Sequence, residues 1–214
     1  MSELLTPKII LILRTMSRDL GRWYYTRELA NLSKVSVGTV SAEVRKLVKE
    51  GLLKQKSEGQ ERYYKLNLKN ARTRKLCELF EIEKVEKLYK ENRRLSWVLE
   101  DFVKRVSGFL PEVQSLILFG SVARGEATPK SDVDILALVS SCEEGQFKKL
   151  MNSVDKLASE VSGRHPARLA PVVMMLKDFE DSIKGKKRLA VDVLKDGIVI
   201  FGQERYYNLL SRVV

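Results

Sequence analysis

Two short apolar runs in the middle of the chain bracket a polar segment, and this pattern limits the fold more than any other feature. The first run is SLILFG at residues 115–120, and the second lies within SDVDILAL at residues 131–138. Each has the length of a buried strand, so the segment predicts two strands joined by a polar connection. Because alternate residues of a strand share a face, we expect Asp132 and Asp134 to point the same way.

The Gly-Ser pair at the end of the first run is typical of an anion site. Gly120 lets a ligand approach the backbone, and Ser121 adds a hydroxyl at the start of a predicted helical turn. Asp132 and Asp134 supply the oxygen ligands that hard divalent cations such as Mg²⁺ prefer. The alternative for the two aspartates is a strand start with two solvated acids, but that alternative does not predict the Gly-Ser pair upstream.

Positive charge is concentrated at the front of the chain. The net charge of +11 divides into +7 for residues 1–70, +3 for 71–110 and +1 for 111–214. This asymmetry favours a polyanion as the partner of the N-terminal part, although a solvated basic surface is the alternative. A length of 214 residues is enough for two small domains.

Composition also argues against several classes of protein. Cys77 and Cys142 match no metal-ligand or redox spacing, and the single histidine, His165, excludes most zinc sites. The apolar run near the N-terminus ends at Arg14, short of the ~20 residues that span a bilayer, and it has no basic leader. We therefore expect a cytoplasmic protein without a membrane partner.

Three helical patterns and a hairpin fill the first 70 residues. Pro7 opens the first helix, Thr26 is expected to cap the second, and Ser36 is expected to cap a third that ends at Gly51. Two strand-like runs then meet at Gly59. The third helix and the hairpin offer groups that could reach phosphates and base edges, namely Ser36, Thr39, Ser41, Arg45, Lys46, Lys54, Lys56 and Arg62.

Residues 26–67, TRELANLSKVSVGTVSAEVRKLVKEGLLKQKSEGQERYYKLN, resemble the winged helix-turn-helix family. The resemblance implies a DNA-binding domain at residues 1–69. Its helix from Ser36 to Glu50 would enter the major groove of double-stranded DNA, and its hairpin would grip the backbone or the minor groove. Protein binding or dimerisation is the alternative use of such a module.

Residues 70–92 predict a helical connector, because they lack Pro and Gly and place apolar residues at near-helical intervals. The apolar stripe could pack on the N-terminal unit or on a second copy of the chain, which leaves a homodimer open. A clearer helical pattern from Leu95 to Val106 begins the last domain, at residues 93–214.

Three elements of that domain, Gly120-Ser121, Arg124-Gly125 and Ser131-Asp132-Val133-Asp134, resemble the nucleotidyltransferase family related to DNA polymerase beta, most closely its minimal members. The resemblance implies an α/β fold with a mixed sheet flanked by helices, so that the whole chain would be a two-domain α+β protein. It also implies binding of an NTP, with ATP expected, together with Mg²⁺ or Mn²⁺, and transfer of a nucleotidyl group. Gly120, Ser121, Arg124 and Ser131 would bind the nucleotide, while Asp132 and Asp134 would ligate metal and act in catalysis. A surface salt bridge is the alternative for Arg124.

The chain departs from this family at one position. Active members usually carry a third acidic residue on a later strand, and the expected strand here, ARLAPVVMML at residues 167–176, has none. Beyond it, Asp178 resembles a helix N-cap, and KGKKR at 184–188 resembles a solvated helix face.

Two functions stay open. One is a transferase that modifies a hydroxyl of a small molecule or of a partner protein, as antitoxin-like minimal members modify a toxin. The other is a non-catalytic regulator whose domain senses nucleotide or docks a partner.

Overall fold

The computed structural model describes residues 5–128, 131–165 and 167–214. Residues 1–4 of the expected N-terminal domain lie outside this range. The chain divides into two compact units, and the boundary falls between Phe80 and Glu81, inside one helix. The N-terminal unit also includes Leu210–Arg212 and Val214, while the rest of the chain after Phe80 forms the C-terminal unit.

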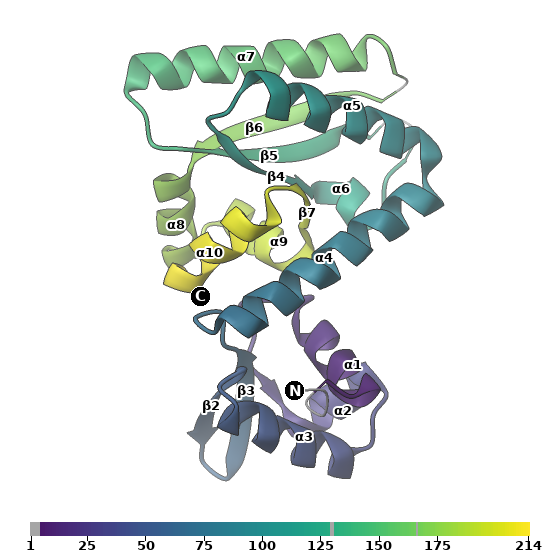
Figure 1. The fold of residues 1–214 in the computed structure, drawn as a ribbon, viewed down its shortest axis with the longest axis vertical. Helices are drawn as coiled ribbons and strands as arrows, with labels where there is room; N and C mark the ends of the chain where they lie inside the picture. Colours follow the sequence, from purple (N-terminus) through teal and green to yellow (C-terminus); the bar gives the residue numbers. More distant parts are fainter. Residues whose placement is uncertain (1–4, 129–130, 166) are drawn as a thin grey trace. The chain divides into compact units, whose positions relative to one another are not determined.

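The N-terminal unit combines helices with a small antiparallel sheet (Figure 1). Its strands are ordered β1-β3-β2, and the hairpin of β2 and β3 turns at Gly59 as predicted. The three predicted helices are also confirmed. In chain order the elements are α1 (Pro7–Met16), β1 (Tyr24–Tyr25), α2 (Thr26–Ser33), α3 (Val37–Lys49), β2 (Leu53–Glu58) and β3 (Glu61–Leu66).

Local signals explain where these helices begin and end. The hydroxyl of Ser36 accepts a hydrogen bond from the Thr39 N–H at 3.3 Å, so the predicted cap of α3 is confirmed. The chain leaves α3 through Gly51, whose φ of +73° is a left-handed conformation that costs glycine little. The prediction for Thr26 was wrong: α2 begins at this residue, because Tyr25 is still extended in the sheet and becomes the cap position.

The predicted connector is the helix α4 (Ala71–Glu91). Before the boundary, the Thr73 hydroxyl donates to the Leu52 carbonyl at 3.2 Å, and the guanidinium of Arg14 lies 4.9 Å from the centre of the Phe80 ring. After the boundary, Val85 and Leu88 pack against the core of the C-terminal unit. Each unit therefore uses the apolar residues of its own half of α4.

The C-terminal unit is a four-stranded mixed sheet with helices on both faces (Figure 1). The strand order is β6-β5-β4-β7, in which β5 and β6 are parallel and the other pairs are antiparallel. In chain order the elements are α5 (Arg93–Phe109), β4 (Val113–Phe119), α6 (Gly120–Ala123), β5 (Val133–Val139), α7 (Glu144–Ser162), β6 (Leu169–Met175), α8 (Leu176–Lys184), α9 (Arg188–Asp196), β7 (Ile198–Phe201) and α10 (Gln203–Val213).

Sheet alternation sorts the residues of β5 onto two faces. Val133 and Ile135 belong to a buried core shared with α5 and α7, which includes Phe102 and Val154. Asp134, which lies between them in sequence, points to the opposite face of the sheet. Helices α8 and α9 pack against that face farther along the sheet (Figure 1). Asp134 is therefore held on the face away from α5 and α7.

Two predictions beyond β6 were wrong. Asp178 is not a cap, because extended backbone ends at Met175 and α8 starts at Leu176, which places Asp178 within the first helical turn. A carboxylate there still suits the helix dipole. The run at 184–188 is not a helix face, because α8 ends at Lys184 and α9 starts at Arg188. Lys186 between them has a φ of +50°, which no helix interior adopts.

Across residues 5–128, 131–165 and 167–214, every helix falls short of the length and apolar character that a bilayer span needs.

Candidate functional site

The site begins where β4 ends in the Gly-Ser turn. Phe119, the last residue of β4, pairs with Asp134 of the neighbouring strand β5. Gly120 follows with a φ of +73°, and a Cβ atom placed on it would lie 2.1 Å from Asp134 Oδ2. The turn and the Asp134 carboxylate are therefore in direct contact, and only glycine leaves room for that contact.

The two aspartates lie at the start of β5. Asp132 directly precedes the strand and Asp134 is its second residue, so the two side chains share one face. The pKa of Asp134 is raised above its ordinary value of 3.8, because burial removes water from the carboxylate and Asp132 repels its charge; Arg124 opposes this shift. A cation beside Asp134 would relieve both effects.

These two carboxylates fit one hard divalent cation. Carboxylate oxygens are the preferred ligands of Mg²⁺, which commonly keeps only one or two protein carboxylates and takes its other ligands from water and phosphate. In the part of the chain that the structure describes, no cluster of three or more His, Cys, Asp and Glu residues could hold a metal. The donor set therefore suits a metal shared with a phosphate ligand.

Arg124 and Ser131 have local partners in the connection between β4 and β5. The Nε of Arg124 donates to Glu126 Oε2 at 2.7 Å. The hydroxyl of Ser131 accepts a hydrogen bond from the Thr128 N–H at 2.9 Å. Both residues thus have partners within the described parts of this connection.

A cavity of about 580 Å³ adjoins Asp132, a volume in the range of small-molecule sites. Asp132 and Ser131 line it, whereas Gly120, Ser121 and Asp134 do not. The sequence had not indicated four other polar residues of its wall, which are Asn92, Arg94, Thr128 and Arg168.

Strand register explains why Arg168 was missed. The Val133 N–H donates to the Arg168 carbonyl at 2.8 Å, so Arg168 stands beside Asp132 just ahead of the paired strands β5 and β6. Its Nε lies 3.8 Å from Asp132 Oδ1. The sequence identified β6 as a strand without acidic residues. A strand pattern does not show which residue of the neighbouring strand lies opposite each position, so it could not place Arg168 beside Asp132.

The segment that contains these residues is similar to known proteins. A family model described as "Nucleotidyltransferase domain" matches residues 95–200. A protein of Methanocaldococcus jannaschii named "Putative protein adenylyltransferase MJ0141" is 34% identical over 77 residues, covering 36% of this chain and 75% of that protein. The chain belongs to the nucleotidyltransferase family.

A second protein of the same organism, of the same name but designated MJ1305, is 26% identical to this nucleotidyltransferase over 125 residues, which are 58% of this chain and 83% of that protein. A crystal structure described as a "putative nucleotidyltransferase" from Sulfolobus solfataricus covers 58% of this chain and 88% of that one. Its sequence identity is 22% and its TM-score is 0.35.

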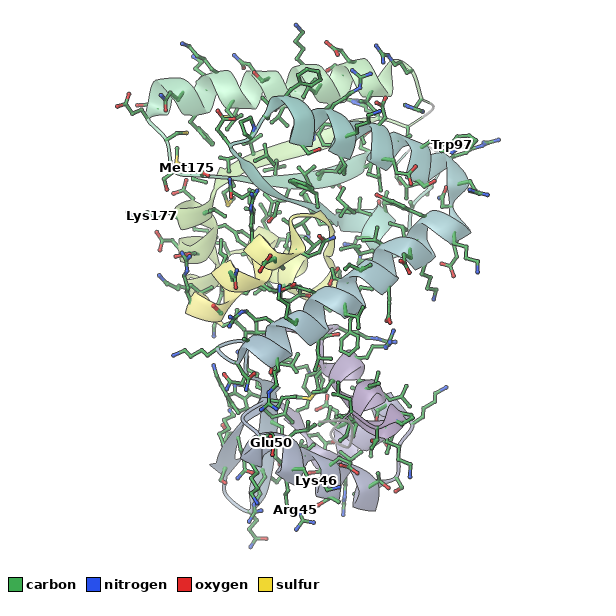
Figure 2. All side chains as sticks on the ribbon, viewed as in Figure 1. Arg45, Lys46, Glu50, Trp97, Met175 and Lys177 are labelled. Carbon is green, nitrogen blue, oxygen red and sulfur yellow. The ribbon has the colours of Figure 1, made fainter. Side chains whose placement is uncertain are left out.

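The N-terminal unit lies outside the segment that matches the nucleotidyltransferase domain, and it has a basic surface of its own. Arg45 and Lys46 project from α3 into solvent (Figure 2). A cavity of about 740 Å³ lies between α3, the start of α2 and the hairpin, lined among others by Arg27, Ser41, Arg45 and Arg62.

Residues predicted to touch DNA also have partners within the N-terminal unit. Arg45 Nε donates to the Ser41 carbonyl at 2.9 Å, and Lys46 Nζ lies 3.2 Å from Glu43 Oε2. Ser36 and Thr39 form the cap of α3. Lys54 Nζ donates to the Val214 carbonyl at 3.4 Å. Lys56 Nζ lies 5.0 Å from the centre of the Trp23 ring and 5.4 Å from that of Tyr63.

Proposed function

We propose that this nucleotidyltransferase binds an NTP, with ATP expected, and transfers its nucleotidyl group to a hydroxyl of a partner protein. The contact between Gly120 and the Asp134 carboxylate carries the proposal, because it joins a backbone that a phosphate can approach to a metal-binding acid. The names of the two Methanocaldococcus relatives describe protein adenylyltransferases, which favours a protein acceptor over a small molecule.

Each residue of the site has a role in this proposal. Gly120 and Ser121 receive the phosphates, Arg124 offsets their charge, and Ser131 fixes the loop ahead of the aspartates. Asp132 and Asp134 would hold Mg²⁺ or Mn²⁺. When bound, the metal neutralises phosphate charge and makes the α-phosphate more electrophilic.

The transfer is a displacement at the α-phosphorus. The acceptor hydroxyl oxygen forms a bond to this phosphorus, while the bond to the bridging oxygen breaks and pyrophosphate leaves with the electron pair. Strand β6 places Ala170 opposite Asp134, and alanine has no group that could accept the hydroxyl proton. The proton therefore passes to solvent. The chain's own contribution is to hold the α-phosphate and its charge in one place.

Incubation of the purified protein with α-labelled ATP and Mg²⁺ tests this proposal. We expect label on a partner protein or in a released product, and we expect Asp132→Ala and Asp134→Ala to abolish it. Glu144→Ala is a matched control, because it removes an exposed carboxylate at the start of α7, outside the cavities that Arg168 lines. Nucleotide binding with no transfer to any acceptor offered would favour the non-catalytic regulator instead. A small helical toxin encoded beside the gene is the first acceptor to try.

We also propose that the N-terminal unit binds double-stranded DNA in the manner of a winged helix. The open cavity between α3 and the hairpin supports this second function, because Arg27, Arg45 and Arg62 gather at it. Helix α3 would enter the major groove and the hairpin would contact the phosphate backbone. Pairing of two chains on DNA and a cytoplasmic location stay predictions.

A further inference from the structure

The strand next to the aspartates brings a positive charge to the site. Strands β5 and β6 are parallel, with Val133 opposite Leu169 and Asp134 opposite Ala170. Alternation therefore puts Arg168 and Ala170 on the same face as Asp132 and Asp134. This face carries two carboxylates and one guanidinium, and the position opposite Asp134 offers no ligand.

This arrangement disfavours a second divalent cation. A second metal would need ligands from β6, but Arg168 is a permanent cation and Ala170 has no donor atom. The Arg168 guanidinium, whose Nε lies 3.8 Å from Asp132 Oδ1, would also repel a second cation on its side of the Asp132 carboxylate. The residues present fit one divalent cation and do not fit two.

Arg168 is available to a ligand. Its side chain is 80% exposed and its contact with Asp132 is longer than a hydrogen bond, so the pair holds it only weakly. It also lines the cavity of about 580 Å³ together with Arg94. A guanidinium can donate two parallel hydrogen bonds to a phosphate, a geometry that suits this position beside the metal ligands.

We propose, on the basis of the function proposed above, that Arg168 binds the phosphates of the NTP and supplies the positive charge that a second metal would otherwise bring. The nucleotide complex then contains one divalent cation per chain. In this complex Asp132 would ligate the metal and would still lie next to Arg168.

Two binding measurements with a non-hydrolysable ATP analogue test the proposal. Electron paramagnetic resonance of Mn²⁺ should count one bound ion per wild-type chain at saturating analogue. Calorimetry in Mg²⁺ should show analogue affinity reduced about tenfold or more in Arg168→Ala, as expected for the loss of charge-assisted hydrogen bonds. Arg168→Lys should keep part of the affinity, because it retains the charge and loses the paired donors.

Arg205→Ala is the matched control, since it removes the same charge from an exposed position on α10 outside the cavity. Two Mn²⁺ ions per wild-type chain, or equal affinities in the Arg168→Ala and Arg205→Ala variants, would overturn the role of Arg168. If the wild type binds the analogue and Asp134→Ala abolishes binding, the proposed function survives that result. If the wild type binds no nucleotide, both proposals fail.

Discussion

Glu81 Oε2 accepts a hydrogen bond from the Tyr207 hydroxyl at 3.0 Å, and Glu81 Oε1 accepts another from the Val199 N–H at 2.9 Å. The Glu81 side chain is only 3% exposed, and Lys84 forms an ion pair with it at 3.2 Å. One buried carboxylate thus ties the second half of α4 to β7 and α10 of the same unit. A buried charge is tolerated here because the named partners satisfy it.

Replacement of Glu81 by alanine is expected to destabilise the C-terminal unit by about 3 kcal/mol, because buried donors on Val199 and Tyr207 lose their acceptor. Urea denaturation followed by circular dichroism measures the change. The control is Glu86→Ala, which alters an exposed glutamate of the same helix and should leave stability within about 0.5 kcal/mol. Equal midpoints for the two variants would show that the carboxylate is not a structural anchor.

Gly120→Ala should abolish nucleotide binding, because its Cβ would overlap Asp134 Oδ2 and push the carboxylate out of place. The left-handed backbone adds about 1–2 kcal/mol of strain. Calorimetry with ATP and Mg²⁺ measures the loss. Gly145→Ala is a fair control, since a Cβ there meets no atom within 4 Å. Retained binding in Gly120→Ala would mean that the turn is not the phosphate site.

Asp134→Asn should stabilise the protein without ligand while it weakens nucleotide and metal binding. Burial and the charge of Asp132 raise the pKa of Asp134, which means that the charged form is held at a cost to folding at neutral pH. Thermal melts in a chelating buffer should therefore give the variant a Tm higher by a few degrees. A lower Tm for the variant than for the wild type would show that the Asp134 carboxylate stabilises the fold.

The cluster around Asp101 predicts a dependence of stability on pH. Burial acts to raise the pKa of Asp101, but Arg105 and His165 outweigh it and the pKa is lowered below 3.8. Arg105 Nε lies 2.8 Å from Asp101 Oδ1, and His165 Nε2 lies 3.4 Å from Oδ2. A depressed pKa contributes stability that is present above the ordinary pKa and is lost as pH falls through the folded-state value.

Wild type and Asp101→Asn should therefore differ in Tm by a constant amount near neutral pH, with the wild type higher. The difference should shrink once the pH falls below about 4, where the carboxylate of the unfolded chain already binds a proton. Thermal melts between pH 7 and pH 3 measure it. A gap that stays unchanged down to pH 3 would exclude ionised Asp101 as its source.

The double variant Arg45→Ala with Lys46→Ala should weaken DNA binding and reduce its salt dependence by about one unit of slope per lost phosphate contact. Fluorescence anisotropy with duplex DNA at several salt concentrations measures both. The control is the double variant Lys8→Ala with Lys69→Ala, which removes the same charge from exposed positions outside α3. If both double variants lose affinity equally, the unit binds DNA by its general charge and not through α3.

Local sequence patterns were sufficient for the helices and the hairpin of the N-terminal unit and for the two strands beside the candidate site. The apolar runs beside Gly120 and Asp134 are strands, and the cap at Ser36 starts α3, because alternation, capping and glycine conformations act within a few residues. The predicted caps were wrong by one residue at Thr26 and by three at Asp178, because extended backbone ends at Tyr25 and at Met175, which have no capping side chain.

Contacts between distant segments were decided only by the tertiary structure. The parallel register of β5 and β6 sets Arg168 beside Asp132, and packing brings Glu81 to a backbone N–H that lies 118 residues away. A strand pattern repeats every two residues whatever its neighbour, and a glutamate on a polar helix looks like any solvated one. The sequence therefore determined which strands and acids the site contains, and the packing of the sheet determined which positive charge stands next to them.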